Sequence, residues 1–428
     1  MFKPHFLILL SGIFLGTSYV PFPPWALGFF WVPLLYALMQ ATSIRQAFFY
    51  TWLAMLGMLG LSFYWIAYVA HEFGFFPWPV AGLILFLFVA LVYFYIPLAG
   101  AFFWYLHHRL RWPLGISLLG FLLTISVSEA FWPGIFPWNL GYPLYWARLS
   151  LAQWADVFGF WGLSLLVHAN SLIIFWALRS PLVWPRKFLA IGLWVILFLG
   201  LQLSGKSHLE QLTPPNAELR VLQVQGNISS LDRLQGELNK GSNEEIARKF
   251  FQMTETALQQ EKAAGRRVDL VVWPESAYPD FLNHEVGYRP MGLRLRDFVR
   301  RQQTPLITGG YAALPSATHF DEYNGLFLFD SQGNLRGKPY HKTKLLVFGE
   351  YTPLSRIFPF LARISPAGTG FTRGTGPEVL EFEEKKWGPQ ICYESLDANF
   401  SAESALLGSQ ILINLTNDSW FGPTSEPY

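Results

Sequence analysis

Residues 388–397 read GPQICYESLD, and this stretch holds the only cysteine of the 428-residue chain. Gly388 to Tyr393 has the pattern of the end of a buried strand, and the polar turn Glu394–Asp397 follows it. A nucleophile suits such a place, because a rigid strand aims the side chain and the turn opens it to substrate. Most lone cysteines are instead buried core thiols, so Cys392 alone leaves both interpretations open.

The composition divides the chain into two parts. Charged residues make up 14% of the chain, whereas soluble domains carry about a quarter. Residues 1–205 contain three acidic and eight basic side chains, and residues 206–428 contain the other 26 acidic and 23 basic ones. We therefore expect a multi-pass membrane domain at 1–205 and a soluble domain at 216–428.

Several classes of partner and cofactor are disfavoured. The net charge of +2 is too small to indicate a nucleic-acid partner. One cysteine excludes an intramolecular disulfide and a zinc site built from cysteines. No motif for a metal or nucleotide stands out, so no cofactor is expected.

Apolar segments recur through the first part. A helix needs about 20 apolar residues to cross a bilayer, and we predict about seven spans, at 5–20, 25–41, 47–70, 79–106, 114–132, 158–178 and 187–204. The first two are short and have Pro21, Pro23 and Pro24 between them, which favours a tight helical hairpin. If the N-terminus is cytoplasmic, seven basic residues lie on inner connections and only Arg148 on an outer one. This bias puts residues 206–428 on the outer face of the membrane, which in a bacterium is the periplasmic face of the inner membrane.

The outer connections are rich in aromatic residues and proline, notably at Trp25, 75–78 and 132–138. This composition is typical of the aromatic belt at the headgroup level, and it also suits a rim where lipid enters. Glu129 lies inside a predicted span, where a carboxylate indicates function by default. It is close to the outer end, however, where water can reach it, and we assign neither Glu129 nor Asp156 a catalytic role.

Strands alternate with helices in the second part. The pattern predicts strands at 218–225, 269–273, 305–311, 324–330, 334–340, 379–382, 388–393 and 410–415, with helices at 243–264, 291–303 and 399–408. This is an α/β domain with a mixed sheet. Glu275, Lys342 and Cys392 each lie at the carboxyl end of a predicted strand. Catalytic and binding residues of α/β folds gather at such strand ends. A glutamate can take the thiol proton, and a lysine cation favours thiolate and stabilises an oxyanion.

The surrounding motifs resemble a known pattern. Trp273-Pro274-Glu275, Tyr340-His341-Lys342 and Ile391-Cys392-Tyr393-Glu394 are similar to the Glu-Lys-Cys pattern of the nitrilase superfamily. With a membrane half in front, the whole chain resembles the apolipoprotein N-acyltransferase family. Further matches are QGNI at 225–228, FGEYTP at 348–353 and NLTNDSWFG at 414–422.

The resemblance implies a nitrilase-like αββα sandwich for the soluble half. It implies Glu275 as base, Lys342 as oxyanion partner and Cys392 as nucleophile. It also implies supporting roles for three further residues, Glu350, Tyr393 and Glu394. The chain departs from the family at Lys344, at Val347 and near Leu234, and the family continues beyond Tyr428, so we expect the sandwich to be incomplete at its C-terminal end.

The loop between Lys342 and Cys392 is unusually apolar. Either it packs on the sandwich or it forms a lid that dips into the bilayer edge. The candidate lid residues are Phe348, Phe358, Phe360 and Phe371.

The implied reaction is a two-step acyl transfer from a phospholipid, through a Cys392 thioester, to the α-amine of a diacylglyceryl-modified cysteine at the N-terminus of an apolipoprotein. A membrane-tethered amidase or hydrolase of the same superfamily is the main alternative. A non-enzymatic membrane protein with a periplasmic binding domain is a remote one, because the predicted spans hold few ionisable groups.

Overall fold

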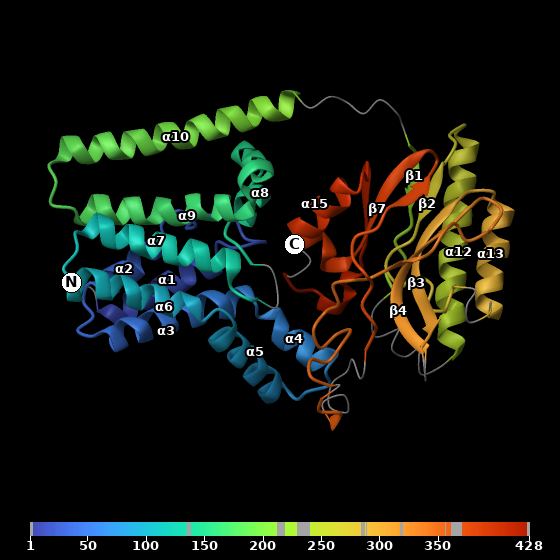
Figure 1. Cartoon of the computed structure of the whole chain (residues 1–428), viewed down its shortest axis with the longest axis horizontal. Helices are drawn as coiled ribbons and strands as arrows, with labels where there is room; N and C mark the ends of the chain where they lie inside the picture. The colour runs from blue at the N-terminus through green and yellow to red at the C-terminus, as the bar shows by residue number, and fades with distance from the viewer. Residues whose placement is uncertain are drawn as a thin grey trace. The chain divides into compact units, whose positions relative to one another are not determined.

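The structure is a computed structural model that describes residues 3–134, 138–211, 219–228, 240–283, 287, 289–316, 320–355, 357–360 and 370–425. Leu234 and part of the aromatic connection at 132–138 lie outside these ranges. The chain forms two compact units, Met1–Pro214 with Pro423–Tyr428, and Pro215–Gly422 (Figure 1). Each unit is described by itself.

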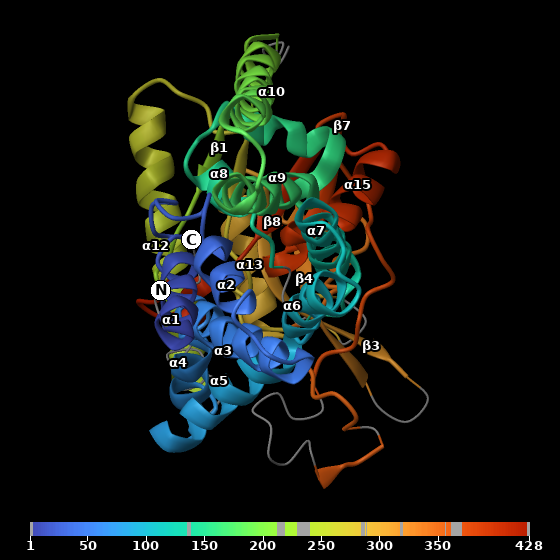
Figure 2. The ribbon, with the colours of Figure 1, turned by 90° about the vertical axis from the view of Figure 1, so that its left-hand side faces the viewer.

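The first unit is helical. Its α-helices are α1 (Pro4–Gly16), α2 (Trp31–Leu38), α3 (Ile44–Ser62), α4 (Trp65–Glu72), α5 (Trp78–Val92), α6 (Tyr95–Trp104), α7 (Leu114–Phe131), α8 (Tyr142–Trp146), α9 (Ala155–Arg179) and α10 (Trp184–Gln211). A π-helical turn, η1 (Tyr105–Arg109), continues α6, and a 3-10 turn, η2 (Ser150–Trp154), precedes α9. Figures 1 and 2 both show α10 at the edge of this unit, beside α8 and α9.

Three helical segments of the described residues are long and apolar enough to cross a membrane: Leu114–Phe131, Ser150–Arg179 and Trp184–Gln211. Two bent pairs, α3 with α4 at 57° and α5 with α6 and η1 at 46°, raise the number to five if each pair is one span. These five segments match the last five of the seven predicted spans.

The first two predicted spans form shorter helices than the sequence suggested. Helix α1 has 13 residues and α2 has eight, so they are about 20 and 12 Å long at 1.5 Å per residue. A hydrocarbon core is about 30 Å thick. The prolines between them lack the N–H groups that a continuing helix needs, and α1 instead packs against α2 and α3.

Glu129 of α7 is buried, contrary to the expectation that water reaches it. Its Oε2 lies 2.9 Å from Nε2 of His168 in α9, and Nδ1 of that ring accepts a hydrogen bond of 2.8 Å from the Trp31 indole of α2. Because an indole N–H only donates, the ring proton must be on Nε2 and points to the carboxylate. The pair therefore joins three helices. Asp156, by contrast, is half exposed and lies 3.3 Å from His208.

The second unit contains two mixed sheets. The first has the order β1 (Val221–Gln223), β2 (Leu270–Val272), β3 (Leu306–Pro315), β4 (Phe320–Phe329) and β5 (Tyr340–His341). Strands β1 to β3 are parallel, and β4 is antiparallel to both its neighbours. The second sheet has β6 (Leu380–Phe382) antiparallel and β8 (Ile411–Leu415) parallel to β7 (Lys385–Ile391). The predicted strand 334–340 shrinks to β5, since Pro339 offers no ladder donor.

Alternation along the strands sets the layers. Val271 and Trp273 face helices α12 (Lys240–Ala263) and α13 (Pro290–Gln302), whereas Leu270 and Val272 face the second sheet. Helix α15 (Ala398–Leu406) covers the outer face of that sheet, where Gln390 Nε2 donates to Ser401 Oγ at 2.8 Å. The order helices, sheet, sheet, helix confirms the predicted αββα sandwich (Figure 1).

Candidate active site

The carboxyl ends of three strands supply the predicted site residues. Glu275 comes three residues after β2, Lys342 directly follows β5, and Cys392 directly follows β7. The parallel register of β7 and β8 pairs Ile391 with Leu415. Cys392 therefore leaves its strand beside Thr416, whose side chain hydrogen-bonds to the thiol.

Lys342 lies at the centre of a buried charged cluster. Its Nζ is 3.1 Å from Glu275 Oε1 and 2.9 Å from Glu350 Oε2, and its side chain is 1% exposed. Burial by itself would lower the pKa of Lys342, but the two carboxylates outweigh it and hold that pKa well above its ordinary value. Lys342 is thus a permanent cation, and two of its three N–H donors are committed to carboxylates.

Asn324 of β4 connects the two carboxylates, and sequence reasoning missed it. Its Nδ2 donates to Glu275 Oε1 and to Glu350 Oε1, each at 2.8 Å. Its backbone carbonyl also accepts from the Lys342 amide at 2.9 Å. Asn324 begins the buried half of β4, residues 324–329, and is its one polar side chain. That was the available signal, because a buried polar group needs a hydrogen-bonding partner inside the fold.

The backbone of Cys392 is unusual. Its φ of 58° lies in the left-handed region, which non-glycine residues seldom adopt and which clusters at functional sites. Burial and the negative charges of Glu275 and Glu350 raise the pKa of the thiol, and Lys342 lowers it only in part. Cys392 therefore rests as a thiol at neutral pH, so it needs a base to become a nucleophile.

The Glu394 carboxylate accepts hydrogen bonds from backbone amides next to Lys342 and next to Cys392. It is fully buried and accepts from Tyr340 Oη at 2.9 Å, from the Thr343 and Lys344 amides at 2.7 and 2.9 Å, and from the Ile391 amide at 2.8 Å. These bonds tie the segment after Lys342 to the segment before Cys392. With this many donors around a buried carboxylate, Glu394 holds these two segments in place relative to each other.

Tyr393 also serves the geometry of this region. Its hydroxyl donates to the Leu345 carbonyl at 2.7 Å, and its ring centre lies 5.8 Å from Lys342 Nζ. Glu350 Oε2 accepts from the Leu346 amide at 2.9 Å as well as from Lys342. The lysine is thereby linked to the first turn of the apolar loop.

The predicted lid residues do not behave alike. Phe348, Phe358 and Phe360 are 56%, 47% and 59% exposed. Phe371 instead stacks on Tyr311 of β3, with ring centres 5.6 Å apart. Residues 361–369, between the two groups, lie outside the described part of the chain.

Both halves of the chain match family models. Residues 11–173 match the apolipoprotein N-acyltransferase N-terminal domain, and residues 224–428 match carbon-nitrogen hydrolase. Apolipoprotein N-acyltransferase of Bdellovibrio bacteriovorus is 39% identical over 98% of this chain and 77% of its own length. The protein of that name from Geobacter metallireducens is 30% identical over 100% of this chain and 80% of its own length. Among solved structures, an amidase from Nesterenkonia sp. AN1 matches 46% of this chain and 67% of its own, with 16% identity and a TM-score of 0.31.

Proposed function

The chain belongs to the apolipoprotein N-acyltransferase family, and we propose that Glu275, Lys342 and Cys392 carry out its acyl transfer through a thioester intermediate. The chain is a membrane acyltransferase that N-acylates lipoproteins. The proposed roles of these residues rest on the geometry of the second unit. The proposed order of the two half-reactions follows from the chemistry of a thioester, which stores an acyl group and yields it to an amine.

In the first half-reaction, Glu275 takes the proton of the Cys392 thiol and the thiolate attacks the ester carbonyl of a phospholipid. The carbonyl oxygen becomes an oxyanion, which accepts the remaining N–H of Lys342. As the intermediate collapses, the carbon–sulfur bond stays and the ester carbon–oxygen bond breaks. The leaving oxygen takes the proton from Glu275, and a lysophospholipid departs.

In the second half-reaction, the α-amine of a diacylglyceryl-modified cysteine attacks the thioester. Glu275 accepts a proton from the amine, a carbon–nitrogen bond forms and the carbon–sulfur bond breaks. The sulfur recovers its proton, and the N-acylated lipoprotein leaves. Glu350 and Asn324 keep Glu275 and Lys342 in place throughout.

The single observation that carries this proposal is the contact between Glu275 and Lys342, 3.1 Å apart and buried, whose opposite charges act on the Cys392 thiol. A hydrolase of the same superfamily would share this chemistry up to the acyl-enzyme. The exposed phenylalanines of the loop at 348–360 favour a lipid substrate over a water-soluble amide.

Mass spectrometry of the intact protein after incubation with a phospholipid tests the proposal. We expect an acyl adduct on Cys392 that is absent from Cys392→Ala, strongly slowed in Glu275→Gln, and unaffected in Asp280→Asn, which alters another buried carboxylate of the same unit. A transferase should keep the thioester until a diacylglyceryl-cysteine peptide is added, whereas a hydrolase would release fatty acid without it. An adduct on Cys392→Ala would refute the nucleophile assignment, since the chain has no other thiol.

We also propose that the chain lies in the bacterial inner membrane with the second unit in the periplasm. The seven-to-one distribution of basic residues supports this orientation. A reporter that works only after export, inserted near Asn243, should be active. Activity of a cytoplasm-only reporter at the same place would contradict the orientation.

A further inference from the structure

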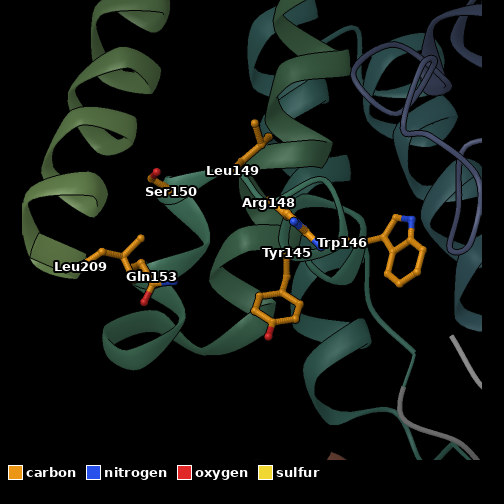
Figure 3. Close-up of a pocket in the computed structure, with 7 residues that line it drawn as sticks. All are labelled: Tyr145, Trp146, Arg148, Leu149, Ser150, Gln153 and Leu209. Atoms are coloured by element: carbon orange, nitrogen blue, oxygen red, sulfur yellow. The ribbon is translucent and has the colours of Figure 1, made fainter. Parts of the chain in front are cut away.

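The first unit contains a pocket of about 630 Å³ between α8, η2 and the last turns of α10 (Figure 3). In one wall of the pocket, α10 packs closely against η2. A Cβ at Gly205 of α10 would collide with the Ser150 carbonyl, and Gln202 Oε1 accepts from the Leu151 amide at 3.1 Å. The pocket is therefore built by close packing of α10 on η2 and is not a gap between loosely placed helices.

The sequence of α10 sets the depth of this pocket in a bilayer. The helix is apolar up to Leu203 and continues as SGKSHLEQ, and Leu209 of that polar end lines the pocket. Six residues beyond Leu203 correspond to about 9 Å along the axis. The headgroup region extends roughly 5–7 Å beyond each side of the hydrocarbon core. Gly205, which packs on the pocket residue Ser150, is two residues or about 3 Å beyond Leu203. The pocket thus extends from the level of the lipid phosphates to just outside the headgroups, and exposed Tyr145 and Trp146 suit that position.

Arg148 is the charged residue of the pocket. It is the one basic residue that the predicted topology puts on the outer connections of the membrane half. Within the described part of the chain, its guanidinium makes no hydrogen bond and no ion pair. Figure 3 shows Arg148 and Tyr145 on one side of the pocket, with Gln153 and Leu209 opposite.

The turn that carries Arg148 does not call for arginine. The Arg148 amide donates to the Tyr145 carbonyl at 2.8 Å and the Leu149 amide to the Leu144 carbonyl at 3.2 Å, which closes α8 in a Schellman motif. The φ of Arg148 is 55°, and glycine is the residue that this position favours. An arginine here is held in a strained backbone conformation, so local folding does not explain its presence.

We propose that this pocket binds the phosphate group of a phospholipid, with Arg148 as its counter-ion. A guanidinium matches phosphate oxygens with two parallel hydrogen bonds. The Ser150 hydroxyl and the Gln153 amide supply further donors, and Leu149 and Leu209 provide apolar surface for the glycerol end of the acyl chains. This inference goes beyond the acyl transfer reaction, because no pocket residue belongs to the unit that contains Cys392.

Native mass spectrometry of the full chain in detergent tests the pocket. The protein would carry Cys392→Ala, so that phospholipid is not consumed and the result is independent of acyl transfer. The probes are phosphatidylglycerol, a diacylglycerol with the same chains, and inorganic phosphate. Arg148→Gln should weaken phosphatidylglycerol binding by about tenfold to a hundredfold, and Arg148→Lys should weaken it less. Arg111→Gln is the matched control, since Arg111 is an exposed arginine with a φ of 58° that lies outside the pocket.

Three results would overturn the proposal. Equal loss of binding in Arg148→Gln and Arg111→Gln would mean that the pocket is not specific. Diacylglycerol binding as tightly as phosphatidylglycerol would mean that the phosphate is not recognised. Displacement of the lipid by inorganic phosphate at equal concentration would make this an anion site and not a lipid site. Because Arg148→Lys keeps the charge, its better binding also separates loss of recognition from loss of folding.

Discussion

Replacing Lys342 by Met should destabilise the second unit far more than an ordinary lysine substitution does. The wild-type cluster holds two carboxylates and one ammonium, for a charge of −1, and Lys342→Met leaves −2 in a buried site. Removing one partner of a buried ion pair typically costs about 3–5 kcal/mol. Lys344 is the matched control, because its Nζ lies 3.1 Å from Asp397 but its side chain is 46% exposed. Its replacement by Met should cost about 0–1 kcal/mol.

Amide hydrogen exchange measures this cost in the intact protein. Local opening free energies of β4 and β7 report the second unit, and amides of α7 in the first unit provide an internal reference. The double variant Lys342→Met with Glu350→Gln restores a charge of −1, and it should be more stable than the sum of the single changes by about 0.5–3 kcal/mol. If Lys342→Met lowered the opening free energy of β4 no more than Lys344→Met does, Lys342 would not be stabilising Glu275 and Glu350. The proposed catalytic cluster would then be wrong.

Three further results are expected. Glu275 raises the pKa of the Cys392 thiol and Lys342 lowers it. The pH midpoint of iodoacetamide alkylation should therefore fall in Glu275→Gln and rise in Lys342→Met. Shifts in the same direction would show that the three residues do not share one site. Glu394→Gln places a donor amide where an acceptor oxygen meets several N–H groups, so kcat should fall by about 10²-fold with KM little changed. Tyr340→Phe removes only one of the donors to Glu394 and should lower kcat less. Equal loss of kcat in the two variants would argue against a positioning role for Glu394. Cys392→Ser should form no detectable acyl adduct by mass spectrometry, since a hydroxyl is much harder to deprotonate than a thiol, and a stable ester on the hydroxyl of that variant would show that the base is stronger than we infer.

The sequence predicted Glu275, Lys342 and Cys392 at strand ends. For Glu275 the signal was the apolar run at 269–273 and the break at Pro274, and for Lys342 and Cys392 it was the turn residues that flank each segment. It did not predict the hydrogen bonds that hold them. Asn324 lies 49 residues from Glu275, and Glu394 reaches amides about 50 residues away. Such contacts depend on the register of strands in two sheets, which no local pattern contains.

The membrane half shows the same limit. Hydropathy placed the apolar segments correctly, yet it could not show that two of them bend by 57° and 46° or that α1 and α2 stop early. It also gave no reason to pair Glu129 with His168, which are 39 residues apart on helices of ordinary apolar composition. Only packing of the helices brings those two side chains together.

The hydrogen bond from the Asn417 amide to Glu275 Oε2, 3.2 Å long, has a consequence for how the protein is made. It joins residues 142 positions apart, and Thr416 beside it belongs to the strand end that flanks the thiol. A ribosome adds residues in order, so the nascent chain carries Cys392 before the neighbouring strand β8 exists. Until β8 has paired with β7, the thiol lacks its Thr416 neighbour and Glu275 lacks one of its hydrogen bonds, although Asn324 and Lys342 already hold that carboxylate.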